Sequence, residues 1–187
     1  MKTSIEETIH FVFAYKTRVS IHARFLVIRF LVTHIRNFLQ LKHMIDNHQS
    51  DPERTLLLHG HISFWNTEEI ENMSGLFRNN TSFNADISAW NVSNVKTMCR
   101  TFMNATSFNQ PLNNWNVSNV IDMSGMFELA SSFNQPLGKW NIANVQRMTH
   151  MFYGARSFHT TSHLSSWKRR LDHVQDTTHM FLFTTPL

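Results

Sequence analysis

Histidine is the residue of this chain with the most evident capacity for chemistry, since twelve histidines occur among its 187 residues. Closely spaced histidines can bind a transition metal, and the closest pairs are His59 with His61 and His159 with His163. Neither pair has a third ligand at a spacing typical of a metal site, and Cys99 is the only cysteine. We therefore expect no bound metal, no cofactor and no disulfide within the chain.

Residues for nucleophilic or acid–base catalysis show no such pattern either. Serines are common, but the sequence contains no G-x-S-x-G elbow, no G-x-G-x-x-G and no P-loop. Glu68, Glu69 and Glu71 cluster where we expect a short helix to begin, and the helix dipole accounts for acidic residues there. Cys99 stands where the next repeat has Ser124, which favours a small structural residue. The sequence thus predicts a protein that is not an enzyme and has no small-molecule substrate.

The elements that would position these side chains are set by an internal repeat. Tryptophans at 65, 90, 115 and 140 are each 25 residues apart, and the segment 115–127 recurs from Trp90 and Trp140. A fixed period of this size is typical of stacked units that bury their apolar faces only against their neighbours. Large apolar residues fill cores first, so we interpret the repeated aromatic residues as core rows rather than as a ligand-stacking face. The rows are Trp65, Trp90, Trp115, Trp140; Phe77, Phe102, Phe127, Phe152; and Phe83, Phe108, Phe133, Phe158.

One repeat combines two local patterns. Val120, Met123 and Phe127 have helical spacing, which predicts a short helix over Val120–Leu129. Residues Phe133–Leu137 should be extended, because the residue before a proline is pushed out of the helical region. The predicted fold class is therefore α/β: a short leucine-rich-repeat-like solenoid with one short extended segment and one short helix per 25-residue coil, and a helical N-terminal cap.

A row of asparagines accompanies the aromatic rows. Asn84, Asn109 and Asn134 follow the second Phe row directly, and His159 takes the equivalent position in the fourth repeat. Asparagine has both donors and an acceptor, so a buried row of this kind could satisfy the turn backbone of adjacent coils. We interpret this row as structural rather than as a ligand site.

Residues 1–48 differ from the repeats. Apolar residues at helical spacing from Arg18 to Ile45 predict a helix, with a strand over Arg24–Val32 as the alternative. A turn-rich break at 47–53 and a strand-like lead-in over Leu56–Phe64 follow. The domains are therefore 1–48 as a helical cap, 49–64 as the lead-in, 65–166 as four repeats, and 167–187 as a degenerate fifth repeat or C-terminal cap.

The motif W-[ND]-[VT]-S-N-V-x-x-M-x-x-M-F-x-x-A-x-x-F-N-Q-P-L is matched almost throughout by Trp115–Leu137. In this it resembles the BspA-type leucine-rich-repeat surface-protein family, in its version with repeats of about 25 residues. The resemblance covers 65 to about 158 strongly and 167–181 weakly. It implies adhesion or protein binding, at the cell surface or after secretion, and carries no catalytic or ligand residues. The sequence contains no convincing signal peptide and no apolar run long enough for a transmembrane helix, so neither feature supports that location.

We expect a non-enzymatic module that binds another protein. The two positions after each repeat valine should face outward and differ in chemistry between coils, which suits recognition. An alternative is a peripheral membrane scaffold, in which the basic stripe of residues 1–48 (Arg18, Arg29 and Arg36) attracts anionic lipid. Sparse charge, at 16% of residues, argues against binding nucleic acid. The predicted partner-binding residues are Lys96, Thr97, Ile121, Asp122, Gln146 and Arg147.

Overall fold

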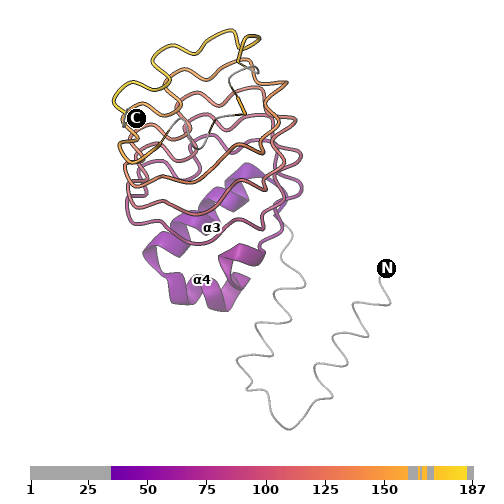
Figure 1. The fold of residues 1–187 in the computed structure, drawn as a ribbon. Coiled ribbons are helices and arrows are strands. Elements are labelled where there is room, and N and C mark those ends of the chain that lie inside the picture. Colours follow the sequence, from indigo (N-terminus) through magenta and orange to yellow (C-terminus); the bar gives the residue numbers. More distant parts are fainter. Residues whose placement is uncertain (1–34, 160–163, 165, 168–170, 185–187) are drawn as a thin grey trace, which may run out of the picture.

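The molecule is a stack of short coils with two helices at one end (Figure 1). The computed structural model describes residues 35–159, 164, 166, 167 and 171–184. Helix α3 covers Phe38–Ser50, helix α4 covers Pro52–His59, and a single 3-10 turn, η1, covers Ile62–Phe64. We number the coils 1 to 5 by their tryptophans, and these are Trp65, Trp90, Trp115, Trp140 and Trp167.

Both helices begin with a side-chain cap. Asn37 Oδ1 accepts the Gln40 N–H at 2.9 Å, and Asp51 Oδ1 accepts the Arg54 N–H at 2.9 Å. Proline at the first position of α4 needs no N–H partner, so the chain can turn at Asp51 and start a new helix at once. The predicted strand-like lead-in over Leu56–Phe64 is wrong, because α4 and η1 occupy it. Of the predicted helix from Arg18, the part before residue 35 lies outside the described residues.

The coils contain neither of the two elements predicted for them. In the part of the chain that the structure describes, no coil residue belongs to an α-helix or a β-strand, and pairing is limited to isolated parallel bridges. The predicted α/β leucine-rich-repeat-like solenoid, with one short extended segment and one short helix in each coil, is therefore wrong. The bridges are Asn72 with Thr97, Thr97 with Asp122, Asp122 with Arg147, and Arg147 with Asp176.

The hydrogen bonds of coil 3 explain why its predicted helix does not form. The N–H groups of Met123, Gly125 and Phe127 donate to carbonyl oxygens of coil 4, at 2.8–2.9 Å. Those of Met126 and Glu128 donate three residues back within the coil, at 3.1 Å. An α-helix needs each N–H to bond four residues back, so this alternation excludes it. The spacing of apolar residues over Val120–Leu129 suits successive three-residue turns as well as it suits a helix.

Left-handed backbone interrupts every coil at the same two positions, four residues apart. A left-handed residue costs an L-amino acid about 1–2 kcal/mol and ends regular helix. Glycine or asparagine occupies many of these positions, but arginine, leucine, histidine and phenylalanine occupy others. The pairs, from coil 1 to coil 5, are Gly75 and Asn79, Arg100 and Asn104, Gly125 and Leu129, His150 and Gly154, and His179 and Phe183.

The segment predicted to be extended, Phe133–Leu137, is held by side chains instead of by strand pairing. Asn109 Oδ1 accepts the backbone N–H of Asn134 at 2.9 Å and the Gln135 side-chain amide at 3.1 Å. Asn84 Oδ1 makes the equivalent contact one coil earlier, where it accepts the Asn109 N–H at 2.9 Å. The asparagine row thus joins the turns of adjacent coils, although its members are half-buried or exposed rather than buried.

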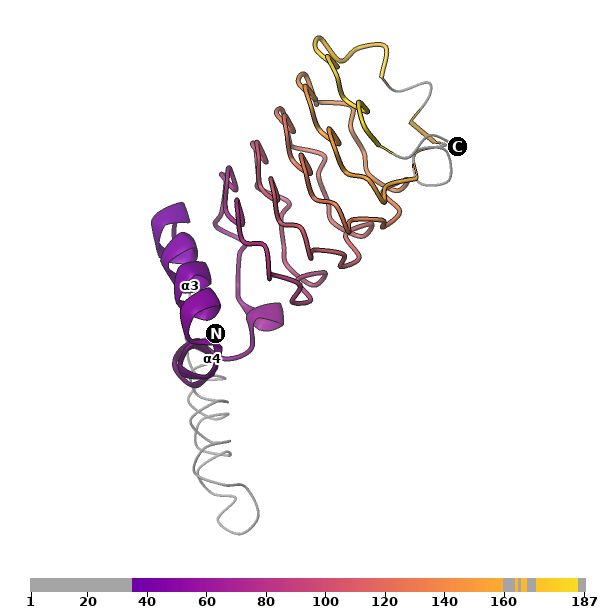
Figure 2. The same ribbon diagram turned by 90° about the vertical axis from the view of Figure 1, so that its left-hand side faces the viewer.

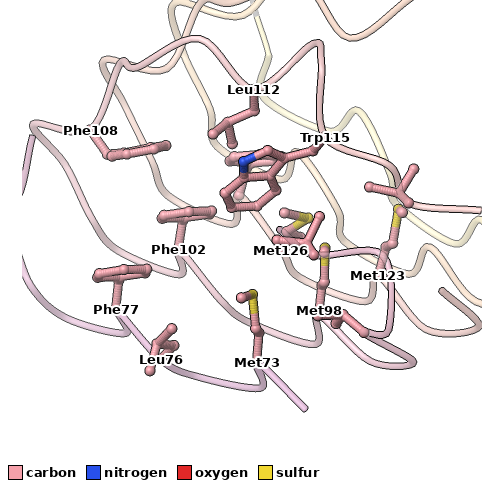
Figure 3. Close-up of a cluster of buried hydrophobic side chains, with 14 of the residues drawn as sticks. Met73, Leu76, Phe77, Met98, Phe102, Phe108, Leu112, Trp115, Met123 and Met126 are labelled. Atoms are coloured by element: carbon pink, nitrogen blue, oxygen red, sulfur yellow. The ribbon is translucent and has the colours of Figure 1, made fainter. Parts of the chain in front are cut away.

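The core runs the length of the stack, between the two sides of each coil. Figure 3 shows part of it, with Phe77, Phe102 and Trp115 among the buried side chains. The rings of Phe102 and Phe127 lie parallel, with centroids 5.5 Å apart, and Phe127 stacks on Phe133 of its own coil at 4.0 Å. Leu41, Met44 and Ile45 of α3 belong to the same buried cluster. Figure 2 shows α3 running along the first coil, so this helix closes one end of the core.

Candidate functional site: a groove on the outer face of the coils

The structure places the three aromatic rows inside the molecule. All twelve residues are at most 5% exposed. Trp65 and Trp90 stack with centroids 6.4 Å apart, and the Trp115 indole donates to a backbone carbonyl. These rings cannot offer a face to a ligand because they are buried in the core.

The six predicted partner-binding residues lie in two adjacent outer columns. Lys96, Ile121 and Gln146 are exposed, and so is Arg147. Thr97 is half-buried, with its hydroxyl 3.0 Å from that of Ser74. The backbone bridges run through the column of Thr97, Asp122 and Arg147.

Two ion pairs link neighbouring coils within these columns. Lys96 Nζ lies 2.8 Å from Glu71 Oε2, and Arg147 Nε lies 3.0 Å from Asp122 Oδ2. Burial acts to raise the pKa of Asp122, but hydrogen bonds from Ser124 and the Arg147 guanidinium outweigh it and hold that pKa below its usual range. Arg147 and Asp122 are therefore engaged with each other, and in the remaining column, that of Glu71, Lys96, Ile121 and Gln146, Glu71 and Lys96 are paired as well.

A groove of about 530 Å³ follows this remaining column across coils 1 to 4. It is open to solvent and crosses the coils rather than running along one of them. We call it the outer groove, and its lining residues are Glu71, Asn94, Lys96, Asn119, Ile121, Asn144 and Gln146.

The three asparagines of the outer groove are held in one orientation. The Nδ2 groups of Asn94, Asn119 and Asn144 donate to the carbonyl oxygens 26 residues earlier, at 2.7–2.8 Å. None of the described residues donates to their Oδ1 atoms in return. Sequence reasoning missed this row and Glu71, although the recurrence of asparagine every 25 residues at these positions is a visible signal.

The other chemistry-bearing residues take structural positions. His61 Nδ1 lies 2.7 Å from the Ser63 hydroxyl, and the His59 ring meets Trp65 edge-on. His163 lies outside the described residues. Among the residues that the structure describes, no group of three histidine, cysteine or carboxylate side chains could hold a metal ion. The expectations of no metal, no cofactor and no catalysis stay predictions.

Glu68, Glu69 and Glu71 do not begin a helix, because coil 1 has none, so the helix-dipole explanation for them is wrong. Of the basic stripe proposed for the membrane alternative, Arg18 and Arg29 lie outside the described residues, and Arg36 is exposed just before α3. Across the described part of the chain, none of the helices has the length and hydrophobicity needed to cross a bilayer.

Comparison with known proteins assigns a family but no activity. Neither the curated proteins nor the solved structures contain a match. The sequence model of one family matches residues 40–167 and, overlapping, 98–186, so that the first match alone covers more than half of the chain. The resemblance to BspA-type repeats is not addressed by this match and stays a prediction. The chain belongs to the family described as Mycoplasma protein of unknown function, DUF285.

Proposed function

We propose that this protein is a non-enzymatic binding module, and that the outer groove binds a segment of another protein. The observation that carries the proposal is the pairing of a constant row with a variable one. Asn94, Asn119 and Asn144 repeat along the groove, whereas the neighbouring column changes from Glu71 to Lys96, Ile121 and Gln146. A constant row can hold any suitable backbone, and a variable row can select among side chains.

The constant row offers hydrogen-bond acceptors at regular intervals. Because each Nδ2 is already bonded to backbone, the asparagine oxygens are fixed in place and need little ordering when a partner arrives. Backbone N–H groups of a polypeptide are suitable donors to such a row.

The variable row would supply specificity. It presents a carboxylate, an ammonium, an aliphatic side chain and an amide in that order along the stack. A protein segment is the polymer whose side chains can match such a sequence of different chemistries. Nucleic acid fits less well, since its affinity depends on several cations meeting phosphates and this groove contains one.

The test compares the full chain with variants of the outer groove and of another face. Ile121→Asp and Gln146→Arg change the groove, and Lys139→Glu is a control, because Lys139 is exposed and outside the groove lining. Photo-crosslinking in lysate of the source cells, followed by measured affinities for each captured protein, gives the readout. We expect a partner whose affinity falls at least about tenfold with the groove variants and hardly changes with the control. Partners that bind all three variants like the wild type would overturn the proposal.

A further inference from the structure

The two ends of the stack differ in what covers them. At the end of coil 1, helix α3 lies along the coil, and its Leu41, Met44 and Ile45 are buried in the common core (Figure 2). At the other end, coil 5 has no further coil beyond it in the described part of the chain. Its outer side carries a cleft of about 470 Å³ lined in part by Met180, Phe181 and Leu182.

Every contact between successive coils uses one register. Four alternate N–H groups of a coil donate to four alternate carbonyl oxygens of the next one, at 2.7–2.9 Å, in all four junctions from coil 1 to coil 5. Fewer bonds run the other way; between coils 2 and 3, for example, the Ile121 N–H donates to the Lys96 carbonyl at 2.8 Å and the Ser132 N–H to the Thr106 carbonyl at 3.2 Å. A coil therefore has a trailing edge, made mostly of donors, and a leading edge, made mostly of acceptors.

The N–H donors on the trailing edge of coil 5 have no hydrogen-bond acceptors in the described part of the chain. None of the described residues accepts a hydrogen bond from the N–H groups of Thr177, His179, Phe181 or Phe183, which are the equivalents of four bonded groups in coil 4. Phe183 is 64% exposed, and Phe181 stacks on Phe152 with one face only. Donors without acceptors and apolar rings together form a surface built for a further coil.

We propose that this trailing edge binds, in trans, the leading edge of a coil belonging to a second repeat-bearing chain. The bound coil would place four carbonyl oxygens on the four free N–H groups and a phenylalanine ring on Phe181. The same interface already holds the coils of this chain together four times over. The proposal concerns a different surface from the outer groove, so the two can fail separately.

Other occupants fit this surface less well. An ordinary β-strand presents N–H and C=O groups of the same residues to its neighbour, so its own donors would face a row of donors. A second trailing edge would do the same, which excludes a symmetric pairing of two ends. A leading edge offers carbonyl oxygens along this stretch and is the matching surface.

Helix α3 explains why this chain would not polymerise on its own. None of the described residues donates to the leading carbonyl oxygens of Asn72, Ser74, Leu76 and Arg78, but α3 lies along that edge. A second copy can therefore bind only if α3 is displaced. The partner chemistry is accordingly a coil of this repeat type whose leading edge is uncovered.

The experiment uses the full chain as receptor and a full-length copy with a loosened cap as probe. Met44→Asp and Ile45→Asp in the probe should release α3, and Phe183→Asp in the probe blocks its own trailing edge, so that probe molecules do not bind one another head to tail. Near-ultraviolet circular dichroism checks that the tryptophan core of the probe is intact. Sedimentation of labelled receptor should show a one-to-one complex with the probe and none with wild-type chain. Phe183→Asp in the receptor should weaken it at least about tenfold, as expected for an exposed aromatic anchor.

The matched control is Phe64→Asp in the receptor, because Phe64 is 61% exposed but lies at the capped end. This variant should bind the probe like the wild type. Absence of a complex with a folded probe, or equal loss with both receptor variants, overturns the proposal.

Amide hydrogen exchange of the wild-type chain alone gives a test that needs no probe. The amides of Thr177, His179, Phe181 and Phe183 should exchange much faster than their bonded equivalents in coil 4, such as Met148. Equal protection in the two coils would show that the edge is already covered and would refute the proposal.

Discussion

The indole Nε1 of Trp115 donates a hydrogen bond of 3.2 Å to the carbonyl oxygen of Ile87, which lies 28 residues earlier in the sequence. The same carbonyl accepts the backbone N–H of Trp90 at 3.1 Å. Trp90, Trp140 and Trp167 make the equivalent bond to a carbonyl 28–30 residues earlier, whereas Trp65 donates to the nearby Gly60 carbonyl. Each of these four tryptophans therefore fills the core and also donates to a turn carbonyl, which would otherwise accept one hydrogen bond instead of two.

Replacement of Trp115 separates these two contributions. Trp115→Ala should lower the free energy of unfolding by about 3–5 kcal/mol, because it leaves a large cavity. Trp115→Phe should cost about 1–3 kcal/mol, since the Ile87 carbonyl keeps one of its two hydrogen bonds. Urea unfolding followed by circular dichroism measures both values. An unchanged unfolding midpoint for Trp115→Ala would rule out a core role for this residue.

Two glycines with left-handed backbone should differ in how much stability is lost when each is replaced by alanine. A Cβ on Gly154 would lie 2.7 Å from Leu129 Cδ2, whereas a Cβ on Gly75 meets no atom closer than 3.8 Å. Gly75→Ala should therefore cost only the left-handed penalty of about 1–2 kcal/mol. Gly154→Ala should cost more, and its excess should shrink when Leu129→Ala is added. Equal costs for the two glycines, measured by thermal unfolding, would contradict this account.

The sequence predicts which residues stack on one another in the core, but it does not predict the local backbone conformation. Phe102 and Phe127 are one period apart in the sequence, and their rings lie 5.5 Å apart. The spacing of Val120, Met123 and Phe127 fits an α-helix and a series of three-residue turns equally well. Arginine, leucine or histidine at a left-handed position carries no sequence signal, so the turns could not be told from a helix.

The candidate site was likewise predictable only in part from the sequence. The exposed column containing Lys96, Ile121 and Gln146 follows from their position next to a buried valine in each repeat. The groove itself depends on side-chain directions, which periodicity does not give. The contact between Lys96 and Glu71 crosses a coil boundary, and Glu71 belongs to the least regular of the four full repeats.

The carboxylate of Asp176 predicts a specific dependence of stability on pH. Hydrogen bonds from the Thr178 side chain and backbone, then from Thr149, lower the pKa of Asp176 to about 2. The unfolded value is about 3.9, so the stabilisation is complete above that pH and is lost as the pH falls through about 2. Asp176→Asn should therefore lose less stability than the wild type between about pH 5 and pH 2. Thr178→Val should raise the pKa, as measured by NMR titration; an unmoved pKa would contradict the assigned cause.

Cys99 should react slowly in the folded protein. Burial and then the Asp122 carboxylate raise the pKa of the Cys99 thiol, so less thiolate is present at neutral pH. Alkylation of the native chain should be much slower than alkylation in urea, and a native rate equal to the unfolded rate would contradict this. Cys99→Ser should change stability by less than about 1 kcal/mol, since coils 1 and 3 have serine at this position.

Leu129 should be a position where a polar substitution stabilises the protein. Its φ is 58°, and the equivalent residues of coils 1 and 2 are Asn79 and Asn104, with φ of 61° and 56°. Asparagine tolerates left-handed backbone better than leucine does, so Leu129→Asn should add up to about 1 kcal/mol despite the loss of some apolar contact. Leu57→Asn is the matched control, because Leu57 is 39% exposed against 41% for Leu129 but lies within helix α4. Asparagine is a poor helix former, so the control should destabilise by about 0.5 kcal/mol. Thermal unfolding of the two variants should therefore shift in opposite directions, and a shift in the same direction would show that the left-handed conformation of Leu129 carries no strain.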